Sequence, residues 1–254
     1  MFEIITDVTC DLQRDILIGE KVKVVPLYII KPNEERIKIT IDYDFEKFYS
    51  EYKDLILKGA LKTSQPSIND FLDAYKSSDY EEIVVITLSS KLSGTYNVAL
   101  SSSKLIKNKK IYVIDSKQAS IGLGLLVREL LKLRKKGLSA MEAIEEIKKV
   151  NVQTYAAIVD INFLLNSGRI NIIKYAFLRL VNKKPIVKVT NGELQLYKLS
   201  DDPFRDIIDI SRGKKEVIFG GSIDFFYTLP EPKVLVNPIV ATVLGPAFGV
   251  AFIE

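Results

Sequence analysis

Three short, mostly apolar runs in the first half of the chain constrain its fold more than any other feature. They are Phe2–Ile5, Ile83–Ile86 and Ile111–Ile114, and each leads into a polar turn. Runs of this kind, without regular polar alternation, are typical of strands that are buried on both faces. Because helical patterns alternate with the strands, we expect an α/β fold whose N-terminal domain is a parallel sheet between two layers of helices.

Signals for helix ends support this alternation. Ser67 and Asp70 have the spacing of a capping box ahead of one helix, and Ser139 and Glu142 have the same spacing ahead of another. The stretch 21–30 is rich in β-branched residues and predicts one further strand. Helices and strands therefore alternate over about the first 150 residues.

The pattern changes after about residue 151. Asn191-Gly192 stands between two apolar segments and predicts a β-hairpin. Further short strands are expected, among them one over 239–243, and helices are expected to be few. We therefore predict two domains: a three-layer α/β/α domain over 1–150 and a smaller two-layer α/β domain with a mixed sheet over 151–254.

The composition excludes several classes of function. The 254 residues include no histidine, which rules out a Ser-His-Asp triad, a Cys-His pair and a histidine-ligated metal site. The single cysteine, Cys10, cannot form an internal disulfide or a cysteine-rich zinc site. The formal net charge is only +4, and the basic residues are scattered, so no nucleic-acid-binding surface is expected.

The sequence also bears on location. No apolar run reaches the ~20 residues that a helix needs to span a membrane. The N-terminus begins directly with a predicted strand and lacks the charged segment and cleavage site of a signal peptide. Since no disulfide framework is needed, we expect a cytoplasmic protein without an integral membrane segment.

Hydroxyl-rich turns follow the predicted strands. In an open parallel sheet these turns share the carboxyl edge, where ligands bind. Ser93-Gly94-Thr95 combines two hydroxyls with a glycine that lets the backbone approach a ligand closely. Thr63-Ser64 precedes its own helix and could fold over the same edge. Hydroxyls together with free N–H groups at helix starts favour an anion.

Three charged residues near these turns have competing interpretations. Arg169 follows Gly168 and carries the forked guanidinium that suits a carboxylate or phosphate, but a surface cation at a helix end is an equal alternative. Asp7 and Asp115 follow two of the strands, and we expect them to cap or orient the turns, because a carboxylate would repel a bound anion. Each hydroxyl taken alone is an ordinary helix cap, so it is their clustering that favours binding.

Several segments, taken in order, match the motifs of a known family. They are Ile5–Leu12, Val25–Leu27, Thr63–Ser67, Ile86–Tyr96, Val113–Gly122, Leu164–Ile170 and Gly245–Gly249. The third is the complete TSQPS motif, and the fourth is a nearly complete SSxLSGTY motif. Over essentially its whole length the chain resembles the DegV family, the fatty-acid-binding subunits of bacterial fatty acid kinases.

The resemblance implies a DegV-like fold with the acyl chain of a long-chain fatty acid buried between or beneath two domains. It implies that Thr63 and Ser93 hold the carboxylate. An ATP-dependent kinase subunit would then phosphorylate that carboxylate, while this chain would be a lipid-binding protein rather than an enzyme, with no cofactor and no metal. The candidate ligand-binding residues are Thr63, Ser64, Ser93, Gly94, Thr95 and Arg169.

Two functions other than fatty-acid binding stay open, and a departure from the family pattern supports the first of them. Val243 stands where the family has a histidine that reaches the head group. A non-catalytic regulatory or interaction protein could keep the fold with such a degenerate head-group site. Alternatively, an enzyme acting on an acidic small molecule would need a base other than histidine, and Asp7 and Asp115 are the candidates.

Overall fold

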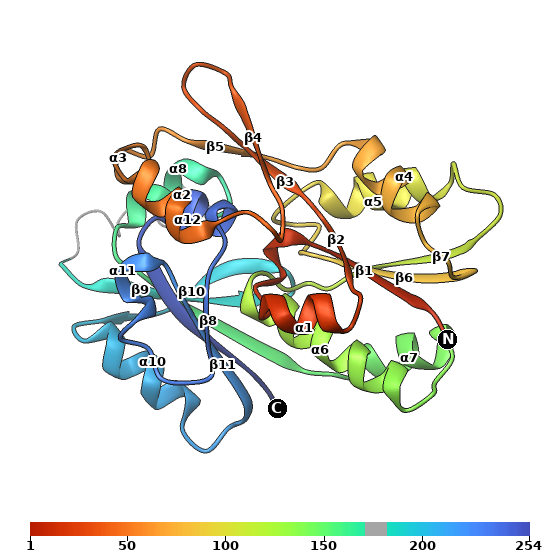
Figure 1. Cartoon of the computed structure of the whole chain (residues 1–254). Helices are drawn as coiled ribbons and strands as arrows, with labels where there is room; N and C mark the ends of the chain where they lie inside the picture. The colour runs from red at the N-terminus through yellow and green to blue at the C-terminus, as the bar shows by residue number, and fades with distance from the viewer. Residues whose placement is uncertain (171–181) are drawn as a thin grey trace.

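The computed structural model describes residues 1–170 and 182–254, whose strands form three β-sheets (Figure 1). The first sheet is four-stranded and wholly parallel, in the order β2-β1-β6-β7. Its strands are β1 (Glu3–Asp7), β2 (Lys23–Val25), β6 (Glu82–Thr87) and β7 (Lys110–Asp115). The parallel sheet expected from the apolar runs is therefore confirmed.

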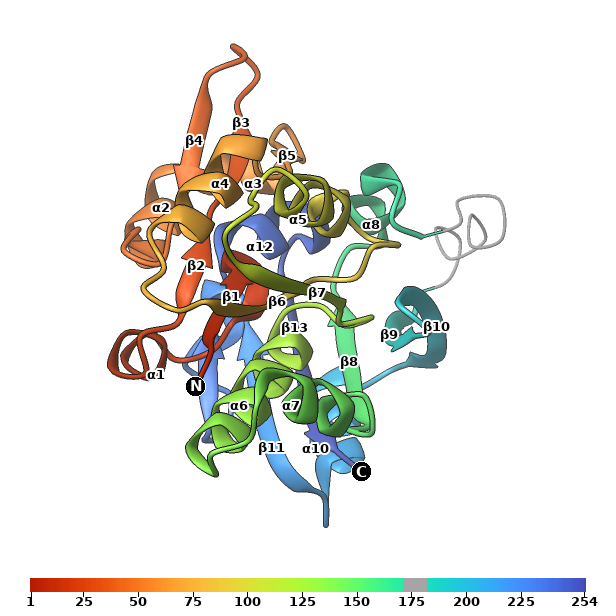
Figure 2. The same ribbon diagram turned by 90° about the vertical axis from the view of Figure 1, so that its right-hand side faces the viewer.

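Helices cover both faces of the parallel sheet, as Figure 2 shows with α4 and α5 above the strands and α6 and α7 beneath them. Their bounds are α4 (Ile68–Lys76), α5 (Thr95–Ser103), α6 (Ile121–Lys135) and α7 (Ala140–Ile147). Successive side chains of a strand point to opposite faces. Accordingly Ile83 and Val85 pack in the cluster with α4 and α5, and Val84 and Ile86 pack with α6 and α7. Continuous apolar runs thus fill both cores.

The predicted helix starts agree with the structure. In α4 the Ser67 hydroxyl accepts from the Asp70 N–H while the Asp70 carboxylate accepts from the Ser67 N–H. Ser139 and Glu142 exchange the same pair of bonds at the start of α7. Both capping boxes are confirmed. Two shorter elements, η1 (Val8–Cys10) and α1 (Arg14–Gly19), connect β1 to β2.

The single strand predicted over 21–30 is wrong, because the segment divides at Pro26. The part before Pro26 is β2 of the parallel sheet, and the part after it belongs to an unexpected antiparallel sheet in the order β4-β3-β5. Proline lacks an N–H and therefore does not continue a ladder. The added elements are β3 (Leu27–Ile30), β4 (Arg36–Ile39), α2 (Phe45–Glu51), α3 (Lys53–Leu57) and β5 (Lys62–Ser64). This small sheet places Thr63 and Ser64 on its edge strand.

The second half contains a six-stranded mixed sheet in the order β10-β9-β8-β13-β11-β12. Its strands are β8 (Val152–Ile158), β9 (Lys184–Thr190), β10 (Glu193–Ser200), β11 (Lys215–Gly221), β12 (Lys233–Leu235) and β13 (Ala247–Ile253). The predicted hairpin joins β9 to β10, and Asn191 and Gly192 have φ values of 50° and 85°. Two positive φ values are what a type I′ turn requires, so this prediction is confirmed.

The strand predicted over 239–243 is wrong, because these residues lie in the helix α12 (Pro238–Leu244). The Asn237 side chain accepts from the N–H groups of Ile239 and Val240, and proline occupies the first helical position. A strong helix start therefore outweighs the strand preference of the β-branched residues. The other helices of this half are α8 (Ile161–Ser167), α10 (Pro203–Ser211) and α11 (Ile223–Phe226).

The two halves of the chain pack against each other through α6 and α12. α6 contacts β1 of the parallel sheet and also β8, β11 and β13 of the mixed sheet, while α12 contacts β3 and β5. The opposite face of the mixed sheet is covered by α10. The sheets themselves divide near residue 151, and the exact domain boundary stays a prediction. Across residues 1–170 and 182–254, no helix has both the length and the apolarity to cross a membrane.

Candidate functional site

A cavity of about 560 Å³ lies where the carboxyl edge of the parallel sheet faces β5, α12 and the mixed sheet. This volume falls within the usual range of small-molecule sites, about 300–1,000 Å³. Most of the lining is apolar. The polar residues of the lining are Thr9, Thr63, Ser64, Gln65, Ser93, Ser120, Thr154 and Arg169.

Small residues of the mixed sheet make room for the cavity. Gly220 on β11 and Ala247 and Gly249 on β13 line it. Their neighbours Phe219 and Val250 point to the other face and pack in the cluster with α10. Because strand residues alternate between faces, β11 and β13 place these small residues at the cavity. Larger apolar side chains of β9 and β10, Val187, Val189 and Leu194, complete this part of the lining. An extended apolar ligand fits such a surface.

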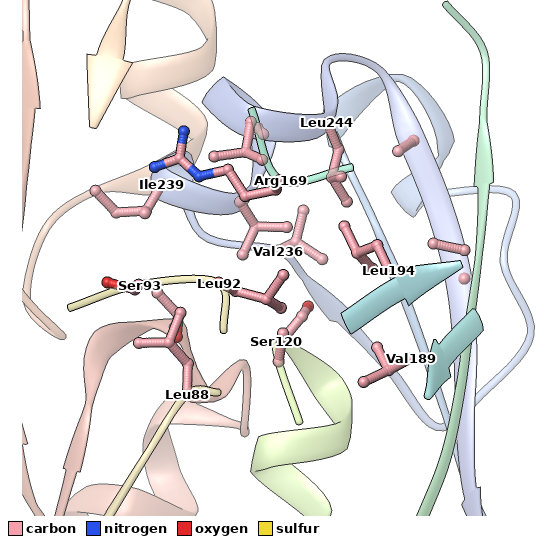
Figure 3. A pocket seen from close by; sticks show the side chains of 18 of the residues that line it. Leu88, Leu92, Ser93, Ser120, Arg169, Val189, Leu194, Val236, Ile239 and Leu244 are labelled. Carbon is pink, nitrogen blue, oxygen red and sulfur yellow. The ribbon is translucent and has the colours of Figure 1, made fainter. Parts of the chain in front are cut away.

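Arg169 lies at one end of the cavity, with its guanidinium group held by the protein (Figure 3). Its Nη2 donates to Thr63 Oγ1 at 3.1 Å, and its Nη1 donates to the carbonyl of Ser167. Within residues 1–170 and 182–254, no carboxylate lies within ion-pair distance of Arg169. Burial lowers the pKa of this guanidinium, but arginine remains charged in proteins. Because the partly buried Arg169 guanidinium has no carboxylate partner among these residues, it favours the binding of an anionic ligand.

Ser93 lies at the same end of the cavity in Figure 3. Its Oγ is 2.9 Å from Thr95 Oγ1 and accepts a hydrogen bond from the Thr95 N–H at 3.3 Å. Gly94 lets this loop meet the loop that carries Thr63, because a Cβ atom at Gly94 would lie 1.9 Å from Gln65 Oε1. The two hydroxyl-rich loops are thus brought together by a close approach that glycine permits.

Hydrogen bonds within the protein orient the hydroxyls of Thr63 and Ser93 at this end of the cavity. Thr63 Oγ1 accepts from Arg169, and Ser93 Oγ accepts from the Thr95 N–H. A hydroxyl has one proton to donate in addition to its lone pairs. Since protein donors occupy acceptor positions on both hydroxyls, their protons can be donated to a ligand. Two hydroxyl donors beside a guanidinium suit a carboxylate.

Comparison with known proteins agrees with this architecture. A family model described as "Uncharacterised protein, DegV family COG1307" matches residues 1–202. The chain belongs to the DegV family. It is 34% identical over 197 residues to DegV domain-containing protein SACOL1460 of Staphylococcus aureus, a match that covers 76% of this chain and 69% of that protein. It is 29% identical over 204 residues to a Thermotoga maritima protein named "Fatty acid-binding protein", covering 77% and 70% of the two chains.

Solved DegV structures share the fold of this chain. A stearic-acid-binding protein from Eubacterium ventriosum has a TM-score of 0.86 at 22% identity and covers 100% of this chain and 98% of its own. A DegV lipid-binding protein from Thermotoga maritima has a TM-score of 0.82 at 24% identity, with coverage of 100% and 99%. The expected DegV-like fold, with one parallel and one mixed sheet, is therefore confirmed.

The structure brings five of the six predicted site residues of this DegV protein to the cavity. Thr63, Ser64, Ser93, Gly94 and Arg169 line it. The sixth residue, Thr95, is fully buried behind Ser93 and supports it from outside the lining. Their contact with a ligand stays a prediction, as does the effect of the valine at position 243, which also lines the cavity and offers no polar group there.

Sequence reasoning missed part of the polar lining. The sequence did not predict Thr9, Gln65, Ser120 and Thr154 as site residues, although the first three lie in the matching motifs. The motif positions were a usable signal for those three residues. Thr154 lies inside a predicted strand, and nothing in the sequence marked it, because its place in the cavity depends on how α6 packs against β8.

The two aspartates considered for catalysis have structural partners instead. Asp7 accepts from the N–H and hydroxyl of Thr9 and from the Leu88 N–H, and burial raises its pKa. Asp115 accepts from the N–H and hydroxyl of Ser90 and from the Lys117 N–H. Neither aspartate belongs to the described lining of the cavity. Their hydrogen bonds join the turns at the sheet edge, so the structure does not place either aspartate as the base that the enzyme alternative would use.

Proposed function

We propose that this DegV protein binds one long-chain fatty acid in the cavity described above. Thr63, Ser93 and Arg169 hold the carboxylate, and the acyl chain lies against the small residues of the mixed sheet. The observation that carries this proposal is the polarity of the cavity, which has hydroxyl donors and Arg169 at one end and mostly apolar lining elsewhere. Among residues 1–170 and 182–254, Arg169 has no carboxylate partner. The names of the Thermotoga maritima relative and the Eubacterium ventriosum structure support this class of ligand.

The acyl chain supplies most of the affinity. About fourteen buried methylenes contribute roughly 11 kcal/mol before losses, at about 0.8 kcal/mol each. Ordering the ligand and losing its free motion offset a large part of this sum. Each hydrogen bond to the charged head group adds about 1.5–3 kcal/mol. The hydroxyls and Arg169 therefore fix the orientation of the ligand and contribute the smaller part of its affinity.

Native mass spectrometry of the purified protein tests this proposal. We expect a mass increase that corresponds to one fatty acid, and denaturing extraction should release that acid. Protein that is empty on purification should bind added palmitate saturably with one-to-one stoichiometry. An empty protein that also shows no saturable binding would refute the proposal and favour the regulatory or interaction protein with a degenerate site.

We further propose that the bound carboxylate is presented to an ATP-dependent kinase in the cytoplasm. A second cavity of about 500 Å³ shares Thr63, Arg169 and Val243 with the first. Its lining includes Lys58 and Lys62, both of which are exposed. The head-group end of the fatty-acid site therefore continues into a second space, where Lys58, Lys62 and Arg169 outnumber the one carboxylate of the described lining, Asp160. A phosphoryl group transferred to the carboxylate would meet favourable charge there.

An acyl-phosphate assay tests the presentation step. The loaded protein is mixed with ATP and the purified catalytic subunit of a bacterial fatty acid kinase, and hydroxylamine traps any acyl phosphate. We expect the hydroxamate to form only when this chain is present and loaded, and Lys58→Glu with Lys62→Glu to lower its rate without loss of fatty acid. If protein that demonstrably holds a fatty acid gives no hydroxamate with any kinase tested, this result would contradict the presentation step alone.

A further inference from the structure

Two hydroxyls in the acyl part of the cavity are oriented opposite to those of the head-group end. Ser120 Oγ donates to Asp11 Oδ2 at 2.5 Å, and Thr154 Oγ1 donates to Gln118 Oε1 at 2.8 Å. Each hydroxyl has a single proton, which these bonds direct into the protein. Both therefore offer lone pairs, and no proton, to the cavity that they line.

The two hydroxyls lie around the first turn of α6. Ser120 immediately precedes this helix, and a Cβ atom at Gly122 would lie 2.1 Å from Thr154 Oγ1. In Figure 3 the Ser120 side chain faces the cavity between Leu92 and Val189, on the side away from the Arg169 guanidinium. Ser120 therefore lies apart from the Arg169 end of the cavity, and Thr154 lies beside the same turn of α6.

The backbone around Ser120 is strained in a way that fixes this hydroxyl. Ser120 has φ 52° and ψ −134°, and its partner Asp11 has φ 32°. Non-glycine residues rarely adopt positive φ and keep it only where their surroundings hold them. Asp11 is held by Asn237, whose backbone N–H and side-chain Nδ2 both donate to Asp11 Oδ1 at 2.8 Å.

We propose, on the basis of the proposed fatty-acid function, that the site accepts acyl chains that carry a mid-chain hydroxyl, with Ser120 Oγ or Thr154 Oγ1 accepting its hydrogen bond. A hydroxyl on the acyl chain supplies a proton for a hydrogen bond, whereas the protons of Ser120 and Thr154 are already donated to Asp11 and Gln118. An oxo group at the same carbon has lone pairs only and would face the lone pairs of both residues. Because an unpaired polar group is strongly disfavoured in an apolar site, the hydroxy and oxo acids are distinguished.

The Asp11→Asn substitution reverses the polarity of Ser120 with little change of shape. Its amide oxygen can accept from Asn237 as the carboxylate does, which leaves the amide nitrogen to donate to Ser120 Oγ. The Ser120 proton is then released to the cavity. Measurements at pH 8 keep the wild-type carboxylate ionised, since burial raises the pKa of Asp11 to about 7.

Calorimetric titration at pH 8 with stearate, hydroxystearates and oxostearates substituted at matched mid-chain carbons tests this inference. For at least one position, the wild type should bind the hydroxy acid at least as tightly as stearate and about tenfold more tightly than the oxo acid. Asp11→Asn should reduce that ratio to about threefold or less. Ser120→Ala combined with Thr154→Val should weaken the hydroxy acid about tenfold relative to stearate in the same variant.

Thr228→Val is the matched control, because Thr228 is exposed and its hydroxyl donates to the Phe225 carbonyl. This variant should leave the affinity ratios among stearate, the hydroxy acid and the oxo acid as in the wild type. Equal affinity for hydroxy and oxo acids at every position, or rejection of every hydroxy acid relative to stearate, would overturn the inference. Ratios that do not respond to Ser120→Ala with Thr154→Val would also overturn it. Failure of stearate itself to bind would instead refute the proposed function.

Discussion

Replacing Arg169 with methionine removes the charge of the head-group site while keeping an unbranched side chain. Arg169 has no carboxylate partner in residues 1–170 and 182–254, and its Nη2 donates to Thr63 Oγ1. A hydrogen bond to a charged group contributes about 1.5–3 kcal/mol. Loss of the hydrogen bond between the Arg169 guanidinium and the bound carboxylate should raise the dissociation constant of palmitate by about 10- to 150-fold. The contacts of the acyl chain should remain.

Titration with palmitate and with the fatty alcohol of the same chain length separates charge from packing. The alcohol carries no charge, so Arg169→Met should weaken palmitate strongly and change the alcohol by about twofold or less. Arg205→Met on α10 is the control, because the Arg205 side chain is 78% exposed, and it should affect neither ligand. Equal weakening of both ligands would show that Arg169 acts through packing, and unchanged palmitate affinity would refute its role in holding the carboxylate.

Four further substitutions test other parts of the structure. Thr63→Val and Ser93→Ala should each weaken palmitate about tenfold in calorimetry, because each removes one hydrogen bond to the charged head group, at the lower end of the range of about 1.5–3 kcal/mol. Gly220→Val should shift the preference in competition binding from stearate toward laurate, since its Cβ would lie 2.8 Å from Ile121 Cγ2 and narrow the cavity. Burial raises the pKa of Asp11 from 3.8 to about 7, so the native state keeps a proton that the unfolded chain has lost. The free energy of unfolding should therefore fall by up to about 4 kcal/mol between pH 4 and 7, and Asp11→Asn should flatten this part of the profile in urea titrations.

Local signals in the sequence predicted most of the first half of the fold. The apolar runs predicted three of the four strands of the parallel sheet, and the Ser67 and Ser139 capping boxes predicted two helix starts. The wrong predictions concern segments whose residue types are compatible with more than one structure. Residues 239–243 have strand preference, but Asn237 and Pro238 start a helix that packs on β3 and β5. The division at Pro26 was missed because both parts of the segment are strands, in different sheets.

The candidate site could be predicted as a set of loops but not as a cavity. The clustering of hydroxyls at one sheet edge indicated where Thr63 and Ser93 would lie, and both line the cavity. The contact between Arg169 and Thr63 joins residues 106 positions apart, and no local pattern carries that information. The same holds for Thr154, whose exposure to the cavity depends on the approach of Gly122. Long-range packing, rather than motif content, decides which hydroxyls face the ligand.

A crystal structure of this protein with palmitate bound tests the central claim most directly. We predict one ligand in the 560 Å³ cavity, with carboxylate oxygens at hydrogen-bond distance, about 2.6–3.2 Å, from Thr63 Oγ1, Ser93 Oγ and the Arg169 guanidinium. The acyl chain should run over Gly220 and Gly249 of the mixed sheet. A carboxylate at the opposite end of the cavity, or a ligand bound elsewhere on the protein, would contradict the account.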